Sequence, residues 1–295
     1  HTAGSTLVSH GSVDFNAATI SLDGNVTIDG DLSFNSAAAT VRANATAAKL
    51  ALVNSTATVA AGGVLSVGPG GIAFGGAAAN TVTLQASAGA PGKLVLGGDV
   101  AFTGSDGTAG LNTGDIAVTQ TAGLLDLGAA SRTFAVNDGL AAVDLAVSAR
   151  LANGSIVKSG TGTLRLDSPN AYAGGTRISA GTLEAIDPAA LGSGAVTLSD
   201  ATLSLRSDAA APPAFAADVT VNGDANIRVD RISVGTSGVL KLGNVSVGGT
   251  RLGVTGANRT LELASLLLSA TPTLDVSVPL IINGPVSQTA AGMGF

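Results

Sequence analysis

One short strand pattern recurs along the chain at a spacing of about 20 residues, and it limits the possible folds more than any other feature. The pattern is a small or turn residue, any residue, an aliphatic residue, any residue and a second aliphatic residue. Its copies are 63–67, 162–166, 181–185, 201–205, 238–242 and 259–263. The central leucines Leu164, Leu183 and Leu203 are 19 and 20 residues apart, and Leu240 and Leu261 are 21 apart. A repeat of this length with several short strands predicts coils that stack on one another.

The segments between these copies also indicate strands and turns. Aliphatic residues alternate with Ser and Thr in short runs, which is typical of half-buried strands. The runs end at Asp-Gly, Asn-Gly or Gly-Gly pairs, which favour turns. No window has a convincing helical stripe, although 188–191 is compatible with a short helical turn closed by Gly192. A β-sandwich or barrel would show similar turns, but the recurrence favours an all-β parallel β-solenoid with strands about 4.8 Å apart.

The composition fits a narrow interior. Hydrophobic residues make up 45% of the chain and aromatic residues only 3%, with no Trp and a single Tyr. The net charge of −6 and the scattered lysines argue against nucleic-acid binding. The absence of Cys excludes disulfides and Cys-ligated metals. The longest apolar stretch, 261–282, is interrupted by Pro272, Asp275 and Pro279, so we expect no membrane-spanning helix in this chain.

Four motifs in residues 158–205 have a specific order and spacing. They are Lys-Ser-Gly-Thr-Gly-Thr-Leu at 158–164, Asn-Ala-Tyr-Ala-Gly-Gly-Thr at 170–176, Ala-Gly-Thr-Leu at 180–183 and Ala-Leu-Gly-Ser-Gly at 190–194. This stretch, about one sixth of the chain, resembles the autotransporter-associated β-strand repeat, also called the passenger-associated transport repeat. The resemblance implies a right-handed parallel β-helix in large exported bacterial proteins, some of which are passengers of autotransporters. It implies no catalytic residue. We expect Tyr172 to pack over a corner of the coil and Asn170 to hydrogen-bond turn backbone.

These observations together predict one continuous solenoid over residues 1–295, with 158–205 as the best-matching repeat. We expect a non-enzymatic structural protein, located outside the cell or on the bacterial surface, that acts as an adhesin, passenger stalk or fibre subunit. Its expected partners are a further solenoid or a second copy joined end to end, and cell-surface or polysaccharide contacts. The end-to-end expectation rests on residues 292–295, which resemble the lead-in to another repeat.

No residue is assigned a catalytic, cofactor-binding or metal-binding role. His10 is read as part of a turn. The Asp-Gly pairs at Asp23 and Asp29 fit ordinary turns better than calcium loops, as do the acids of a glycine-rich stretch, Asp99, Asp106 and Asp115.

Three further patterns are also given no functional role. The glycine-rich segments 68–71 and 104–107 are expected to be loops and not phosphate-binding loops. Asn-x-Ser/Thr triplets are attributed mostly to chance; they begin at Asn25, Asn44, Asn54, Asn153, Asn244 and Asn258. The Thr-x-Thr segments 56–58 and 81–83 are similar to ice-binding threonine arrays, but nothing in the sequence aligns them.

The main alternative is a carbohydrate-active β-helix enzyme, because any two of the 20 acids might meet in the fold. Three or more acids clustered with an Arg on one solvent face would favour the enzyme, and scattered charges would favour the structural protein. The low aromatic content argues against the platform on which such enzymes stack sugars.

Alternation also predicts which side chains point into the solenoid. The residues expected inside are Leu164, Leu183, Leu203, Leu240 and Leu261. Those expected outside are Arg165, Glu184, Ser204, Lys241 and Glu262.

Overall fold

The computed structural model describes residues 4–103, 108–113, 121–209, 212–215, 217–233, 238–269 and 271–289. These residues form β-strands and turns, and they include no helix able to cross a membrane. Parallel strands stack as a β-solenoid of about 12 turns, which confirms the predicted fold class. Contacts divide the chain into two compact units: unit 1 is His1–Ser155 with Gly162–Leu164, and unit 2 is Ile156–Thr161 with Arg165–Phe295. The right-handed winding and the single continuous domain stay predictions.

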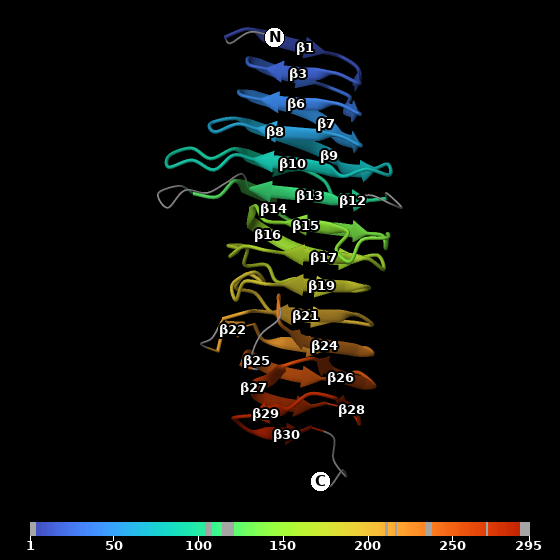
Figure 1. The fold of residues 1–295 in the computed structure, drawn as a ribbon, viewed down its shortest axis with the longest axis vertical. Helices are drawn as coiled ribbons and strands as arrows, with labels where there is room; N and C mark the ends of the chain where they lie inside the picture. The colour runs from blue at the N-terminus through green and yellow to red at the C-terminus, as the bar shows by residue number, and fades with distance from the viewer. Residues whose placement is uncertain are drawn as a thin grey trace. The chain divides into compact units, whose positions relative to one another are not determined.

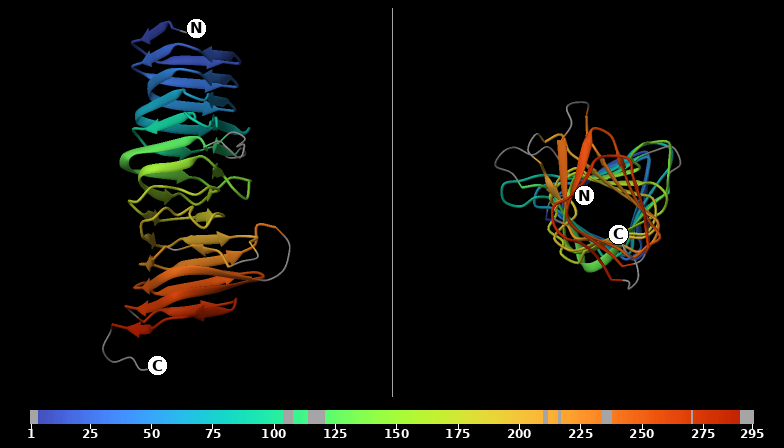
Figure 2. Two further views of the ribbon diagram at one scale, coloured as in Figure 1. Left: turned by 90° about the vertical axis from the view of Figure 1, so that its left-hand side faces the viewer. Right: turned by 90° about the horizontal axis from the view of Figure 1, so that it is seen from below.

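Each coil consists of up to three short strand segments. In both units, the first two segments belong to one sheet, called sheet A, and the third belongs to another, called sheet B. Successive strands of one sheet follow each other in parallel within a unit (Figure 1). The end-on view shows the chain winding around an interior (Figure 2), and the aliphatic side chains fill this space.

The described residues of unit 1 form 15 complete strands. Those in sheet A are β1 (Thr6–Ser9), β2 (Val13–Asn16), β4 (Asn25–Ile28), β5 (Asp31–Asn35), β7 (Asn44–Val53), β9 (Val64–Gly75), β11 (Lys93–Leu96), β12 (Val100–Phe102) and β14 (Leu124–Val136). Those in sheet B are β3 (Thr19–Leu22), β6 (Ala38–Val41), β8 (Thr56–Val59), β10 (Asn80–Leu84), β13 (Ala109–Thr113) and β15 (Leu145–Val147).

The division between the units passes through β16 (Arg150–Ser159) in sheet A and β17 (Thr163–Leu166) in sheet B. The remaining sheet A strands of unit 2 are β18 (Thr176–Ile178), β20 (Val196–Leu198), β22 (Ala214–Phe215), β23 (Val219–Val221), β25 (Gly238–Val247), β27 (Arg259–Leu268), β29 (Leu280–Ile282) and β30 (Val286–Gln288). The sheet B strands are β19 (Thr182–Ala185), β21 (Thr202–Arg206), β24 (Ala225–Asp230), β26 (Arg251–Gly256) and β28 (Thr273–Val276).

The coils differ in length. Val26 pairs with Leu7 in the preceding coil and with Ala45 in the following one, which fits the predicted period of about 20 residues. Further along unit 1, Leu94 pairs with Leu65 and with Leu125, so these coils are considerably longer. Many of the additional residues lie between strands, and some lie within strands, because β7 and β9 shift their register between Ala47 and Lys49. The sequence period therefore identifies the fold but does not hold for every coil.

The five leucines expected inside the solenoid are all fully buried, which confirms the predicted alternation. They belong to two different ladders. Leu183 pairs with Leu203 on sheet B, whereas Leu240 pairs with Leu261 on sheet A. Each buried leucine contributes about 1.5–3 kcal/mol relative to an exposed one. One sequence pattern thus forms strands on both sheets.

The prediction that five residues point outward and are exposed is wrong in one respect. Arg165, Lys241 and Glu262 are partly exposed, and Lys241 Nζ lies 2.9 Å from Glu262 Oε1 on the neighbouring strand. Glu184 and Ser204, although they alternate with the interior leucines, are buried. Alternation determines only the face of the sheet, and side chains from neighbouring strands cover these two residues on the outer face.

The loop predicted at 68–71 is wrong, because these residues lie within β9. Gly71 has a φ of 66°, and a Cβ at this position would lie 2.0 Å from the carbonyl oxygen of Asp99. The glycines therefore let one strand bend where the next coil approaches closely. The segment at 188–191 is a hydrogen-bonded turn: Ala190 N donates to Asp187 O, and Gly192, with a φ of 68°, closes it.

Candidate functional site

Tyr172 lies in the interior of unit 2. Its side chain is fully buried, and its hydroxyl is 2.7 Å from Thr176 Oγ1. Burial raises the pKa of this phenol, and the hydrogen bond to Thr176 opposes the increase. A Cβ on Gly192 would lie 2.4 Å from Tyr172 O and 2.8 Å from its ring, so this turn needs glycine to pack on the tyrosine.

Two polar side chains of the same region donate hydrogen bonds to carbonyl oxygens of the backbone. Asn170 Nδ2 donates to Ala190 O at 2.7 Å, which confirms the expected contact with turn backbone. Lys158 is fully buried, and its ammonium group donates to the carbonyl oxygens of Ser159, Gly160 and Ala180 at 2.7–3.2 Å. Both side chains donate to backbone carbonyls, so Lys158 and Asn170 have structural roles.

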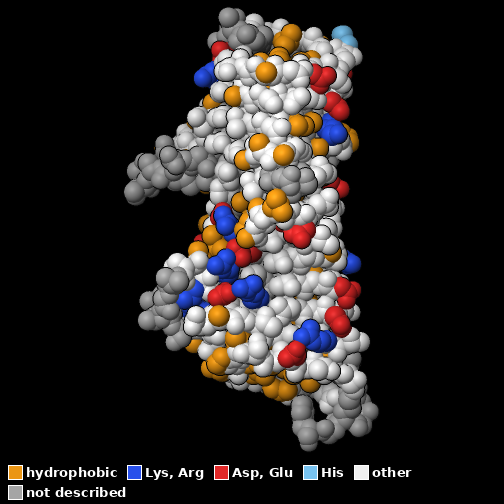
Figure 3. All heavy atoms as spheres, turned by 45° about the vertical axis from the view of Figure 1, so that its right-hand side comes forward, with side chains coloured by type: hydrophobic (Ala, Val, Ile, Leu, Met, Phe, Trp, Pro, Cys, Tyr) orange, Lys and Arg blue, Asp and Glu red, His pale blue; other side chains and the backbone are white. Residues whose placement is uncertain are grey.

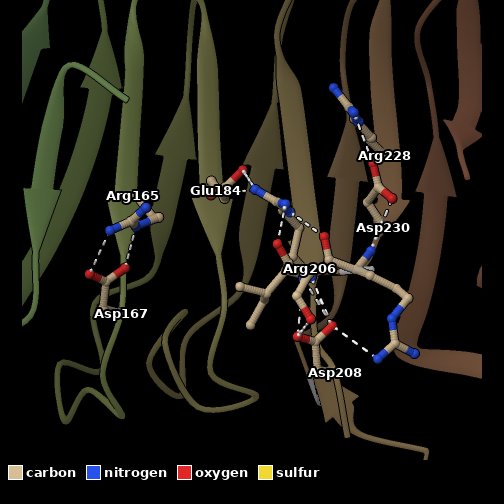
Figure 4. Close-up of polar contacts among 10 residues, drawn as sticks. Arg165, Asp167, Glu184, Arg206, Asp208, Arg228 and Asp230 are labelled. Atoms are coloured by element: carbon tan, nitrogen blue, oxygen red, sulfur yellow. Dashed lines mark hydrogen bonds and ion pairs between the residues drawn. The ribbon is translucent and has the colours of Figure 1, made fainter. Parts of the chain in front are cut away.

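The main cluster of charged side chains on the described surface of unit 2 lies on the outer face of sheet B. We call it the ion-pair ladder, and it comprises Arg165, Asp167, Glu184, Arg206, Asp208, Arg228, Asp230 and Arg231. Figure 3 shows Lys and Arg side chains gathered beside Asp and Glu on one face, and Figure 4 shows the contacts within the ladder. Its members come from or follow β17, β19, β21 and β24.

Two pairs are formed by residues two positions apart. Arg165 Nε and Nη2 donate to the two oxygens of Asp167 at 2.6 and 3.2 Å, and Arg228 Nη2 donates to Asp230 Oδ2 at 2.8 Å. The hydrogen bond to Asp167 raises the pKa of Arg165 although burial opposes it. Residues two apart on a strand share a face, and the sequence contains this signal, although our sequence analysis did not use it.

Arg206 connects different coils. Its Nη1 lies 3.2 Å from Glu184 Oε2, and its Nε and Nη2 donate to the carbonyl oxygens of Arg231 and Ile232. All three guanidinium nitrogens of Arg206 therefore have acceptors. Because Glu184 and Arg206 are 22 residues apart, this contact depends on how the coils stack and was not visible in the sequence.

Asp208 belongs to a second pair between coils. Its carboxylate accepts hydrogen bonds from Ser233 Oγ at 2.6 Å and from the backbone of Ile232 and Ser233, and Arg231 Nη2 lies 3.2 Å away. The hydrogen bond from the Ser233 side chain is the largest cause of a lowered pKa at Asp208.

The structure brings two of the other candidate residues of unit 1 together. His10 Nδ1 lies 2.8 Å from Asp29 Oδ2 in an exposed pair. Asp23 accepts hydrogen bonds from Ser21 and Arg42, and these hold the pKa of Asp23 below its ordinary value. Asp99 accepts from the backbone of Thr133. Among the described residues there is no group of three or more His, Cys, Asp or Glu side chains suited to a metal ion.

Several candidates fall outside the described residues: Asp106, Asp115, segment 104–107 and residues 292–295. The asparagines of the Asn-x-Ser/Thr triplets are exposed except Asn54, which is half-buried. Asn54, Asn153 and Asn258 have φ values of 52°, 59° and 57°, so a turn conformation explains asparagine there.

The structure aligns the two Thr-x-Thr segments, which the sequence did not. Thr56 pairs with Thr81 and Thr58 with Thr83 across β8 and β10. Thr40 extends the second of these columns into β6. The outer face of sheet B in unit 1 is therefore rich in hydroxyl groups.

Comparisons with known proteins agree with the geometry of the Tyr172 region. Residues 156–185 match the family described as passenger-associated-transport-repeat. The chain is also 38% identical over 146 residues to the adhesin BmaC autotransporter of Brucella suis biovar 1 (strain 1330). That match covers 49% of this chain and 4% of the relative's length. No solved structure matches.

The segment that matches the repeat, 156–185, contains Lys158, Asn170 and Tyr172, and most of the ion-pair ladder lies C-terminal to it. Lys158, Asn170 and Tyr172 are used in internal contacts, so the repeat's motif is explained by folding. Three residues belong both to the matching segment and to the ladder: Arg165, Asp167 and Glu184.

The ladder meets the condition that we set for an enzyme, because it combines four acids with arginines on one face. Glycosidic cleavage requires a general acid, that is, a carboxyl group whose pKa is raised. The pKa of Asp208 is lowered, and Asp167, Glu184 and Asp230 each accept an ion pair from an arginine. The lowered pKa of Asp208 opposes a role for this residue as the proton donor.

Proposed function

We propose that this chain is a segment of an adhesin-like passenger, exposed outside the cell or on a bacterial surface, that acts by binding and not by catalysis. The match of residues 156–185 to the passenger-associated transport repeat is the observation that carries this proposal. The likeness to an adhesin autotransporter supports it. Because the chain spans only 4% of that relative, the activity of the whole relative is not transferred to it.

The ion-pair ladder is the contact surface in this proposal. Its guanidinium groups point outward from a sheet whose inner residues hold the fold, so the outer face is free to bind without altering the core. Buried Lys158 and Tyr172 provide the stable coil next to it. The expected role as a rigid stalk or fibre subunit is a part of the same proposal.

Adhesion can be tested with beads that carry the purified chain, incubated with cultured animal cells. We expect more beads on cells than with beads that carry an unrelated acidic β-protein of similar size. Adhesion no greater than that of the control protein would contradict the proposed function.

Carbohydrate-active catalysis is the second candidate, favoured only by the number of acids in the ladder. Incubating the chain with a panel of polysaccharides and measuring new reducing ends or unsaturated products distinguishes the two functions. Turnover that is lost in Glu184→Gln would overturn the non-enzymatic proposal, and no turnover on any polysaccharide would agree with it.

We also propose that the sheet edge formed by β28–β30 is covered by a further solenoid coil, supplied by a longer chain or a second copy. Leu274, Val276, Ile281 and Val286 are exposed there, and parallel strands leave unpaired backbone groups at a sheet edge. Light scattering over a range of concentrations tests the second copy: growth in mass that Val276→Lys abolishes would support it, and a constant monomer mass would exclude it.

A further inference from the structure

The two partners of the ladder's ion pairs are not equally exposed. The side chains of Arg165 and Asp167 are 33% and 18% exposed, and those of Arg206 and Glu184 are 28% and 10% exposed. Arg228 is 56% exposed, against 17% for Asp230. In these three pairs the carboxylate lies beneath and the guanidinium lies on top.

The fourth pair has the opposite arrangement, since Arg231 is 13% exposed and Asp208 is 33% exposed. Asp208, however, is occupied by two Ser233 donors and by the backbone of Ile232. The face is neutral by count. Its most exposed charged side chain is that of Arg228, and Arg165 is as exposed as Asp208.

These two arginines also keep unused donors. A guanidinium carries five N–H groups in a planar fork. Arg165 uses Nε and Nη2 on Asp167, and Arg228 uses Nη2 on Asp230. Among the described residues, no acceptor lies within hydrogen-bond distance of Arg165 Nη1 or of Arg228 Nε and Nη1. The acids beneath hold the forks in place and leave these N–H groups facing solvent.

This geometry selects among possible ligands. Guanidinium groups bind oxyanions such as sulfate and carboxylate in a bidentate manner. Neutral sugars usually bind by stacking on aromatic rings, but Tyr172 and Phe215, the aromatic residues in the described part of unit 2, are fully buried. A flat, exposed sheet face also suits a polymer better than a small molecule, because several weak contacts can then form together.

The ligand that fits is therefore a polysaccharide that carries oxyanions. We propose that Arg165 and Arg228 bind the sulfate groups of a sulfated glycosaminoglycan on an animal cell surface. Arg206, whose three nitrogens are already bonded, positions the ladder by joining Glu184 to the turn after β24. This inference rests on the proposed adhesive function. The overall net charge of −6 does not prevent it, because exposed charges are screened beyond about 8 Å at physiological salt.

Binding to immobilised heparin, measured by surface plasmon resonance at 50–300 mM NaCl, tests the proposal directly. We expect Arg165→Gln and Arg228→Gln each to weaken binding about fivefold and the double variant to weaken it more than tenfold, because each removes a charged hydrogen bond. Arg177→Gln is the matched control, since Arg177 is an exposed arginine on sheet A of the same unit. It should change the affinity less than twofold.

Chemically altered polymers test the selectivity for sulfate. De-N-sulfated, de-O-sulfated heparin and neutral dextran should bind at least tenfold more weakly than heparin, and duplex DNA should not compete at equal phosphate and sulfate concentration. Equal binding of DNA, equal losses in all three arginine variants, or no binding to heparin at 50 mM NaCl would overturn the proposal. Melting temperatures of all variants must match wild type, so that unfolding is not mistaken for lost binding.

The bead assay separates this inference from the proposed function. Beads that adhere to cells in the same numbers after heparinase treatment would overturn the glycosaminoglycan and leave the adhesive function in place. Beads that do not adhere to untreated cells would overturn the adhesive function itself.

Discussion

The outer face of sheet B carries different chemistry in the two units. In unit 1 its columns consist of hydroxyl residues, as in the pairing of Thr58 with Thr40 and Thr83. In unit 2 the same face carries arginines and carboxylates, as in the pairing of Arg206 with Asp230. Seven of the ten arginines lie in unit 2: Arg165, Arg177, Arg206, Arg228, Arg231, Arg251 and Arg259.

The inner face of sheet B is the same in both units. Val82 pairs with Ala57 in unit 1, and Leu203 pairs with Leu183 and Ile227 in unit 2, and all of these are buried. Stacking requires only that the inward positions be aliphatic, because each one contacts its equivalent in the next coil. The outward positions are not limited in this way. One scaffold can therefore carry many hydroxyl side chains on this face in one unit and many charged side chains in the other.

The largest expected effect tests whether the inner faces are equivalent. Val82→Asp in unit 1 and Leu183→Asp in unit 2 should each destabilise the protein by several kcal/mol, because each buries an unpaired charge. Thr56→Asp, on the exposed outer face of unit 1, should cost less than about 1 kcal/mol. Chemical denaturation followed by circular dichroism measures all three. Similar losses for Val82→Asp and Thr56→Asp would show that the inner and outer faces are assigned wrongly.

The next effect concerns the buried ammonium group found in unit 2. Lys158→Met should destabilise by about 3 kcal/mol, because three carbonyls lose a charged donor. Lys241→Met is the matched control: Lys241 is partly exposed in a surface ion pair with Glu262, and its loss should cost about 0.5 kcal/mol. Denaturant midpoints of the two variants give the comparison. A cost at Lys158 no greater than that at Lys241 would contradict the structural role of the buried lysine.

A smaller effect separates the charged face of unit 2 from the hydroxyl face of unit 1. We expect Glu184→Ala to cost about 1 kcal/mol, since Glu184 is buried beneath Arg206 and its removal takes away the ion pair. Thr58→Val in unit 1 should change stability by less than about 0.5 kcal/mol. Thermal unfolding measures both, and a neutral Glu184→Ala would mean that the ladder adds nothing to the fold.

The smallest effect is the dependence on pH. Hydrogen bonds from Ser233 hold the pKa of Asp208 in unit 2 below its ordinary value of 3.8. In unit 1, burial opposes the shift, yet hydrogen bonds from Lys93 and Gly128 also lower the pKa of Asp126. A carboxyl with a lowered pKa stabilises the folded state above its unfolded pKa, and this contribution is lost as the pH falls through the folded pKa.

The melting temperature should therefore be nearly constant from pH 7 to about pH 5 and should fall below pH 3.8. Asp208→Asn and Asp126→Asn should each make this acid-side decrease less steep. Calorimetry between pH 7 and pH 2.5 provides the measurement. A decrease in the two variants as steep as in the wild type would show that neither carboxylate contributes to the pH dependence.

Alternation and turn residues determined much of the fold without any coordinates. The five inner leucines are buried as predicted, and the motifs around Lys158 and Tyr172 correctly indicated the repeat. These are local properties: a strand has a period of two whatever its neighbours are, and turns need particular residues at fixed places. The length of the coils was less predictable, because the residues added between strands do not disturb the register that they connect.

Tertiary structure alone decided which outer residues meet. The sequence placed Glu184 outside, but only stacking showed that Arg206, 22 residues later, covers it. Likewise, the sequence contained two separate Thr-x-Thr segments, and the coil length between them brought Thr58 beside Thr83. The direction of a side chain follows from its own strand, whereas its neighbours in the next coil depend on how many residues the intervening loops contain. The buried leucines could therefore be predicted from the sequence, and the ion-pair ladder could not.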